Sequence, residues 1–348
     1  MPRTLAAPPV PVPALEMSGE AQMGDHIIAA EWSPDGRMVA TATVSGPVGI
    51  WDSGGKLVRE LPGHKHGTFA VSWNANGELL ATGGQDGVAR VWDAATGEPR
   101  QELDAGASWV EHVAFSPLGD FLVTAAGRQL KLWKAGGELV HAYGAHPSTI
   151  SSVAWQPGAF YFASAAYGQL ATFGVDKPEP VKSFAWKGSI LAVAWSPDGN
   201  YMATGNQDAS VHFWYRKSGR DLEMTGYPAK IRELSWDTGS RYLATGGSPV
   251  VTIWDCGGKG PAGTRPIQLQ AHEVYLSAVA YQSNGGLLAS GCRAGWVYVW
   301  NQRKPDRPLR GARLDGAITQ LCWAPADEHL AATTERGMLR IFRRTSQA

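Results

Sequence analysis

The sequence predicts an all-β protein built from eight copies of one unit of about 40 residues. Three observations indicate this. An aromatic residue before a turn recurs at a nearly fixed interval, a strand of small residues follows each turn, and a further strand then ends in an aromatic residue. The recurring aromatic residues are Trp32, Trp73, Phe115, Trp155, Trp195, Trp236, Tyr281 and Trp323. Their successive spacings are 41, 42, 40, 40, 41, 45 and 42 residues, a regularity typical of repeat arrays.

Each unit is expected to form four short antiparallel strands. The first has apolar residues at fixed places, as in residues 190–196 (ILAVAWS), and ends at a tight turn such as Pro197-Asp198-Gly199, where glycine supplies a positive φ. The second is rich in small residues, as in 80–84 (LATGG), and a more variable fourth follows the third, as in 56–61 (KLVREL). The third strands end at Trp51, Trp92, Trp133, Phe173, Trp214, Trp254, Trp300 and Phe342. Because one such unit cannot bury both of its faces, neighbouring units must stack on one another.

The composition is that of an ordinary globular chain, with 44% apolar and 18% charged residues among 348. Lys plus Arg equals Asp plus Glu, at 31 each, so no overall field draws the chain toward nucleic acid or an anionic membrane. We expect neither as a partner. Cys256, Cys292 and Cys322 are too few and too scattered for a disulfide framework or a closed zinc site, and are expected to be buried in a reducing compartment.

No membrane or export segment is expected. No apolar stretch approaches the roughly 20 residues that span a bilayer. Prolines interrupt residues 1–17, where a signal peptide would need a continuous apolar core. We therefore expect a cytoplasmic protein.

The repeats resemble WD40 repeats of the β-propeller superfamily over residues 24–343. The internal tetrad of that family pairs a His before the first strand with a Ser or Thr, an Asp and the Trp. The second repeat matches it fully, with His64, Thr82, Asp86 and Trp92. The fifth repeat lacks the His and keeps Thr204, Asp208 and Trp214. The seventh keeps His272, Ser290 and Trp300 but has Ala294 in place of the Asp. A short standalone chain of this kind is more similar to bacterial-type members than to eukaryotic scaffold subunits.

The resemblance implies a single propeller, and the repeat arithmetic favours eight four-stranded blades, with seven as the alternative. The last repeat has no fourth strand after it, and an open sheet edge is a liability that natural proteins avoid. Residues 12–18 (VPALEMS) are therefore expected to be the closing strand of the last blade. The predicted organisation is a flexible Pro-rich lead over 1–11, one propeller domain over 12–343, a tail over 344–348, and a monomeric ring.

No catalytic motif is present: the chain lacks a Gly-x-Ser-x-Gly elbow, a Walker-type phosphate loop and a His-Glu-x-x-His pair. His64 and His66 have a spacing that could hold a metal ion from a turn, but the tetrad commits His64, so they are weak candidates and no metal site is predicted. Residues 93–99 (DAATGEP) are faintly similar to the repeat of quinone-dependent propeller dehydrogenases. No enzyme activity and no cofactor are expected. The alternatives are a metal-ion or small-ligand accessory protein and a propeller enzyme with a site in the channel.

The predicted function is a non-enzymatic scaffold that binds another protein or a peptide. The resemblance places the loops before the first strands, and the turns between second and third strands, on one face around the channel mouth. Aromatic and charged residues at these positions are the types that anchor interfaces. The predicted partner-binding residues are Phe69, Trp109, Glu111, Tyr167, Lys230, Arg232, Tyr275 and Arg293. Trp186 and Trp296 are expected to pack in the core instead.

Overall fold

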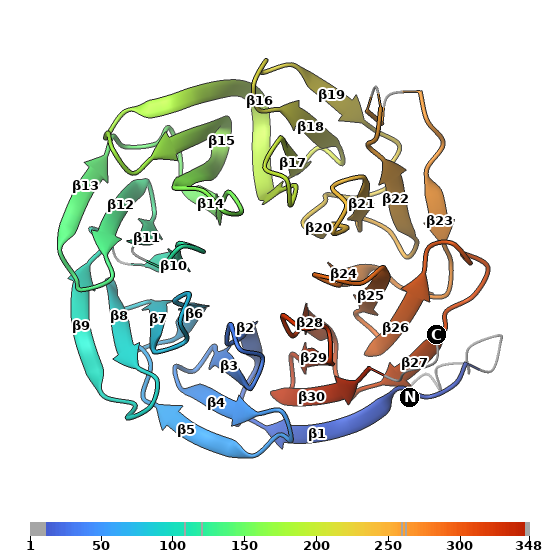
Figure 1. Cartoon of the computed structure of the whole chain (residues 1–348), viewed down its shortest axis with the longest axis horizontal. Coiled ribbons are helices and arrows are strands. Elements are labelled where there is room, and N and C mark those ends of the chain that lie inside the picture. Colours follow the sequence, from blue (N-terminus) through green and yellow to red (C-terminus); the bar gives the residue numbers. More distant parts are fainter. Residues whose placement is uncertain (1–11, 108, 120, 259, 262, 345–348) are drawn as a thin grey trace.

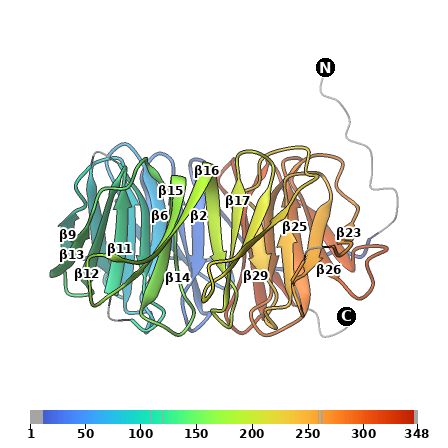
Figure 2. The same cartoon turned by 90° about the horizontal axis from the view of Figure 1, so that it is seen from above.

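The computed structural model describes residues 12–344 except 108, 120, 259 and 262, so the predicted lead over residues 1–11 lies outside the described residues. The strands form a closed ring around a central opening (Figure 1), and from the side this ring is a low cylinder with most strands running between its two faces (Figure 2). Within the described part of the chain, no helix is long and apolar enough to cross a membrane.

Most sheets run in chain order from an inner strand at the channel to an outer strand at the rim. The first three are β2 (Ile27–Trp32), β3 (Met38–Thr43), β4 (Val48–Asp52), β5 (Leu57–Leu61); β6 (Thr68–Trp73), β7 (Leu79–Gly84), β8 (Val88–Asp93), β9 (Pro99–Asp104); and β10 (Val110–Phe115), β11 (Phe121–Ala126), β12 (Gln129–Lys134), β13 (Leu139–Tyr143). A larger sheet holds β14 (Ile150–Trp155), β15 (Tyr161–Gly174), β16 (Pro180–Trp195), β17 (Tyr201–Asn206), β18 (Val211–Tyr215) and β19 (Asp221–Met224). The next two are β20 (Leu234–Trp236), β21 (Tyr242–Thr245), β22 (Val251–Asp255), β23 (Ile267–Leu269) and β24 (Leu276–Tyr281), β25 (Leu287–Cys292), β26 (Trp296–Asn301), β27 (Arg310–Arg313). The last joins β28 (Ile318–Trp323), β29 (His329–Thr334) and β30 (Met338–Arg343) to β1 (Glu16–Gln22).

The prediction of eight four-stranded blades is wrong. With a blade taken as one hydrogen-bonded sheet, the structure has seven among the described residues: six with four strands, and one with the six strands β14 to β19. The cause is β16, which runs for 16 residues without a break. Its first part pairs with β15, as in Phe173↔Pro180, and its last part pairs with β17, as in Trp195↔Met202. The eight sequence repeats are therefore carried by seven sheets, because no turn separates the fourth repeat from the fifth.

The N-terminal strand lies at the outer edge of the last sheet. β1 pairs antiparallel with β30, from Glu16↔Arg343 to Gln22↔Met338. The strand thus starts four residues later than the expected 12–18 segment and extends four residues beyond it. The chain before β1 continues onto the neighbouring sheet, where the Leu15 amide donates to the Gly311 carbonyl at 3.0 Å. The two ends of the ring are held together in this way (Figure 1).

The apolar core is divided into clusters that lie between neighbouring sheets. One cluster joins Val48 and Ile50 of β4 to Val71 and Trp73 of β6, all nearly inaccessible to solvent. Both faces of such a sheet are buried against neighbours, which explains why the second strands consist of small residues and the third of large ones. The core therefore depends on the whole ring.

The recurring first-strand tryptophans bond adjacent repeats together. In six repeats the indole Nε1 donates to a backbone carbonyl on the inner strand of the preceding repeat, at 2.9–3.3 Å. Trp73, for example, donates to the Glu31 carbonyl at 3.1 Å. Phe115 has no such donor. The interval of about 40 residues between these tryptophans is therefore also the interval at which an indole hydrogen bond joins neighbouring repeats.

The turn after the first strand explains the Ser-Pro-Asp-Gly motif. The Ser196 hydroxyl donates to Asp198 at 2.6 Å and accepts from the Tyr201 amide at 3.0 Å. Gly199 has φ +66°, a conformation that residues with a Cβ adopt at a cost. The hydrogen bond from Ser196 helps to hold the pKa of Asp198 below its usual value, against the opposing effect of burial.

Candidate protein-binding face

The predicted tetrad of the second repeat forms a connected chain of hydrogen bonds. His64 is buried, with Nδ1 2.7 Å from Asp86 Oδ1 and Nε2 2.7 Å from Thr82 Oγ1. Trp92 Nε1 donates to the same Thr82 oxygen at 2.9 Å. Arg90 Nη1 donates to the second Asp86 oxygen at 2.6 Å. Burial lowers the pKa of His64, and hydrogen bonds from Arg90 and His64 bring the pKa of Asp86 down to about 2 despite burial. This network ties the loop before β6 to the two strands behind it.

The other repeats carry parts of the tetrad. His272 Nε2 lies 2.8 Å from Ser290 Oγ, but with Ala294 in place of the Asp its buried Nδ1 has no partner. The sequence reasoning missed two related sites. His146 makes the same contact to Ser164 at 2.7 Å, and Tyr227 replaces the imidazole by bridging a Trp and a Thr. The spacing of 18 residues between His146 and Ser164, which His64 and Thr82 also have, was the available signal.

The metal alternative has little geometric support. Both ring nitrogens of His64 are engaged inside the tetrad, while His66 is exposed in a turn with φ +72°. Across the described residues, no group of three or more His, Cys, Asp or Glu side chains could hold a metal ion. His64 is thus engaged in the tetrad, whereas His66 is outside it.

The inner strands aim side chains at the channel mouth through a recurring β-bulge. In seven repeats the pairing between the first and second strands skips one residue near the start of the first strand. In β6 the skip lies between Thr68 and Ala70, and in β10 it lies between Val110 and His112. A bulge leaves one residue out of the ladder and redirects its side chain. The residues left out include Phe69 and Glu111, both predicted partner-binding residues.

A cavity of about 770 Å³ opens at this mouth, and its lining includes four of the eight predicted residues: Phe69, Trp109, Glu111 and Arg232. The rings of Phe69 and Trp109 lie 5.7 Å apart between centroids with a tilt of 53°. The side chain of Trp109 is 53% exposed. The mouth thus combines the exposed Trp109 and the half-buried Phe69 with a carboxylate from β10 and a guanidinium from the loop before β20.

The other four predicted residues do not line this cavity. Tyr167 and Tyr275 are 56% and 40% exposed, and Lys230 is also exposed. The Arg293 amide donates to the Tyr275 carbonyl at 3.2 Å, and Arg293 lines a separate groove. These residues surround the mouth and do not join the Phe69–Trp109 pair in one pocket.

The channel holds half-buried titratable groups, of which the sequence predicted Glu111 but not Glu31 and His112. Glu31 lines both the mouth cavity and a second cavity at the other end of the channel, and burial raises its pKa to about 8. Burial lowers the pKa of His112 to about 4, helped by the charge of Arg232, and burial also raises the pKa of Glu111. Glu31 stands where other repeats have Ser, Ala or Cys, a difference visible in the sequence.

The two expected core tryptophans are partly buried. Trp186 packs against His212 with ring centroids 3.9 Å apart, and its Nε1 is buried without a partner. Trp296 stacks on Tyr298 at 5.6 Å and lies beside the guanidinium of Arg313. Neither lines the mouth cavity.

Comparisons with known proteins agree with this architecture. The family model described as IFT122 first beta-propeller matches residues 26–258, and the model described as WD domain, G-beta repeat matches residues 263–301. The chain belongs to the WD40 β-propeller family. Among solved structures, the crystal structure of the computationally designed Ika8 protein superimposes with a TM-score of 0.82. The match covers 94% of this chain and 100% of that one at 20% identity, and shows the fold alone.

Curated relatives of this WD40 propeller are more distant. It is 29% identical over 116 residues to meiotic fizzy-related protein 2 of Schizosaccharomyces pombe, a match that covers 33% of this chain and 22% of that protein. It is 24% identical over 169 residues to THO complex subunit 3 of Arabidopsis thaliana, covering 47% and 49%. The chain spans less than half the length of either relative. Both are eukaryotic and give no support to the expected bacterial-type membership.

WD40 propellers of this family typically act as scaffolds for protein interactions and are mainly non-enzymatic. That coarse function applies to the family to which the chain belongs.

Proposed function

We propose that this WD40 propeller is a non-enzymatic scaffold that binds another protein or a peptide at the channel mouth. The observation that carries the proposal is the exposed Trp109, packed against Phe69 at the edge of the mouth cavity. Aromatic side chains bury much area with little loss of conformational freedom, and with Arg they are enriched among the residues that dominate binding energy.

The magnitude follows from the area of the side chain. A Trp that is about half exposed leaves roughly 100 Å² to be covered by a partner. At about 25 cal/mol per Å², that contact contributes about 2–3 kcal/mol. Removal of the Trp109 side chain should therefore weaken binding by about 30- to 100-fold.

Charges around the pair support a polypeptide ligand. Glu111 and Arg232 come from different parts of the ring and line the same cavity. A partner that contacts both side chains needs a hydrogen-bond donor for Glu111 and an acceptor for Arg232, at some distance from the apolar group that contacts Trp109. An extended peptide or a protein loop has groups spaced in this way. The pull-down described next would identify the partner.

The test compares tagged wild-type protein with two double variants in pull-downs from native lysate, followed by mass spectrometry. The test variant carries Trp109→Ala and Arg232→Ala. The control carries Leu118→Ala and Arg37→Ala, which also remove exposed groups, from turns at the opposite end of the inner strands. A protein captured by wild type and control but lost by the test variant supports the proposal. Equal capture by all three, or capture of nothing above background, contradicts it.

A further inference from the structure

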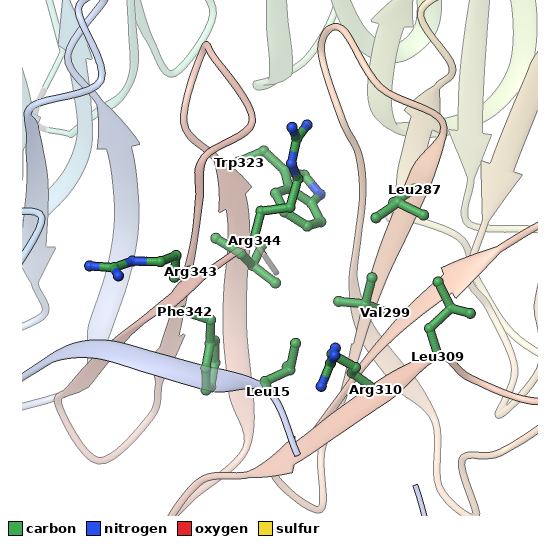
Figure 3. A pocket seen from close by; sticks show the side chains of 10 residues that line it. Leu15, Leu287, Val299, Leu309, Arg310, Trp323, Phe342, Arg343 and Arg344 are labelled. Carbon is green, nitrogen blue, oxygen red and sulfur yellow. The ribbon is translucent and has the colours of Figure 1, made fainter. Parts of the chain in front are cut away.

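A second surface lies where the sheet β24–β27 meets the sheet of β28–β30 and β1 (Figure 3). Its floor is apolar, with Leu287 and Val299 from the first sheet, Trp323 and Phe342 from the second, and Leu15 from the segment before β1. The enclosed cavity measures about 20 Å³. That volume admits the tip of one aliphatic side chain, since a single water needs about 10–15 Å³ on the same measure.

The rim of this pocket is formed by arginines. Arg310, Arg343 and Arg344 line it; in Figure 3 the Arg344 side chain crosses Trp323, whereas the Arg343 guanidinium extends away from the pocket, on the face of β30 opposite to Phe342. Arg343 and Arg344 are exposed, and in the described part of the chain neither guanidinium makes an ion pair or a hydrogen bond. Arg310 Nη1 donates to the Ala14 carbonyl at 3.2 Å. Arg344 at the rim is therefore available to a ligand, whereas Arg343 faces away from the pocket.

The pocket continues into a cleft of about 940 Å³, because Arg344 and Leu287 line both. The cleft adds Arg303, which is exposed, and Gln282, whose side chain is buried and whose Nε2 donor has no hydrogen-bond partner. A buried donor without an acceptor is unfavourable and is expected to bind an oxygen atom when one is supplied. The cleft, like the pocket rim, therefore favours a ligand that offers oxygen atoms to cationic and amide donors.

The carboxylates near this surface do not cancel that preference. Asp237 lines the cleft, but its Oδ1 accepts from the backbone amides of Arg241 and Tyr242 at 2.7 and 2.6 Å. Glu16 is opposite Arg343 in the strand register, and no ion pair joins them within 4.0 Å among the described side chains. The local balance stays positive although the whole chain is neutral.

We propose that this arginine groove, formed by the pocket with Arg310 and Arg344 and the adjoining cleft with Arg303 and Gln282, binds an acidic segment of a partner protein. The segment carries one aliphatic side chain between its carboxylates. Carboxylates bind the guanidinium groups through charge-assisted hydrogen bonds, and the aliphatic side chain enters the apolar pocket. The apolar floor favours a polypeptide over a nucleic acid, which has no aliphatic group to fill it.

The groove is separate from the proposed mouth site. Trp323 ends its inner strand and Leu287 begins the strand after the turn, whereas the mouth residues lie at the start of the inner strands. The two surfaces are thus on opposite faces of the ring, and each can fail its test independently. Two ligands on one ring would make the protein a bridge between partners.

The probe is a fluorescein-labelled peptide Asp-Glu-Leu-Glu-Asp with blocked ends, measured by fluorescence anisotropy with the full chain. Arg303→Glu with Arg344→Glu should weaken its binding by about tenfold or more. Arg100→Glu with Arg220→Glu changes the net charge equally, outside both the groove and the mouth, and should leave binding unchanged. The peptide Asp-Glu-Ser-Glu-Asp should bind several-fold more weakly than the Leu peptide because it cannot fill the pocket.

Four outcomes overturn the proposal. These are no binding of the Leu peptide to wild type, equal loss in both double variants, equal affinity for the Ser peptide, and tighter binding of single-stranded RNA or phosphatidylserine vesicles through Arg303 and Arg344. All substituted arginines are exposed, and equal thermal unfolding midpoints for the variants verify that the fold is intact.

Discussion

Replacement of Asp86 by Ala tests whether the complete tetrad stabilises the ring. The substitution makes the second repeat resemble the seventh, where Ala294 stands at the same position and His272 Nδ1 is unpartnered. Asp86 Oδ1 contacts His64 Nδ1 at 2.7 Å, and Oδ2 accepts from Arg90 Nη1 at 2.6 Å. Its side chain is 15% exposed, so water does not readily replace these contacts. Asp86→Ala therefore removes the carboxylate partner of the buried imidazole Nδ1 and leaves it beside Arg90 Nη1, a cationic donor 2.7 Å away.

The expected loss is about 2–4 kcal/mol in the free energy of unfolding. Hydrogen bonds to charged groups contribute about 1.5–3 kcal/mol each, and Arg90 keeps part of its binding through Glu102. The pKa gives a second estimate. A fall from 3.8 to about 2 corresponds to about 2.5 kcal/mol at neutral pH, because a tenfold change in a proton-binding constant is worth about 1.4 kcal/mol.

The assay is urea unfolding followed by tryptophan fluorescence at neutral pH, with Asp208→Ala as the matched control. Asp208 has the same place in the fifth repeat, but no tetrad His is there, and it accepts only from Ser210 at 2.6 Å in the described structure. Its replacement should cost less than about 0.5 kcal/mol. Because the folded pKa of Asp86 is lowered, its contribution is present above about pH 4 and is lost as the pH falls toward 2. Equal effects of the two substitutions at neutral pH would refute the tetrad reasoning.

Other substitutions test the channel carboxyl, the tryptophan bonds between repeats and the incomplete tetrad. Burial raises the pKa of Glu31 from 4.5 to about 8, so the contribution of its protonated form to stability is lost as the pH rises from 4.5 to 8. Glu31→Gln should therefore raise the free energy of unfolding by about 1–3 kcal/mol near pH 8 and not near pH 4. A pH-independent effect in urea unfolding would contradict this. Trp73→Phe removes the 3.1 Å bond to the Glu31 carbonyl and should lower the unfolding free energy by about 1–2 kcal/mol, visible as a lower thermal midpoint; an unchanged midpoint would rule out a stabilising role. Burial lowers the pKa of His272 to about 3, so its contribution to stability is lost as the pH falls from about 6.5. Ala294→Asp supplies an acceptor and should raise that pKa in an NMR titration of the ring, whereas an unaltered titration would show that the new carboxylate does not reach Nδ1.

The sequence was a good guide wherever the structure depends on contacts that recur once in each repeat. Trp73 and its equivalents identified the inner strands because each occupies the same place between two repeats. Ser196, Asp198 and Gly199 identified a turn whose hydrogen bonds are made within a few residues. The tetrad residue set of the second repeat could be identified from spacing alone, since all members lie within one repeat.

The sequence predicted Phe69, Glu111 and Arg232 at the channel mouth, but not the backbone geometry that places them there. Phe69 and Glu111 face the mouth because a bulge shifts the register of their strands, and no residue in the sequence marks a bulge. Arg232 reaches the same cavity from a distant part of the ring. Glu31 was visible as an acidic residue at a position of small ones, but only the closed channel gives it a raised pKa.

By itself the sequence determined the repeat, the strand order within it and the residues of the tetrad, because hydrogen bonds and side-chain packing within about 40 residues set these features. Only the tertiary structure decided that the eight repeats form seven sheets, since this depends on whether β16 stays extended between two neighbours. It also decided which charges gather at the arginine groove. Arg303, Arg310 and Arg344 come from different strands and loops, and the packing of the sheet β24–β27 against the sheet of β28–β30 brings them to one surface.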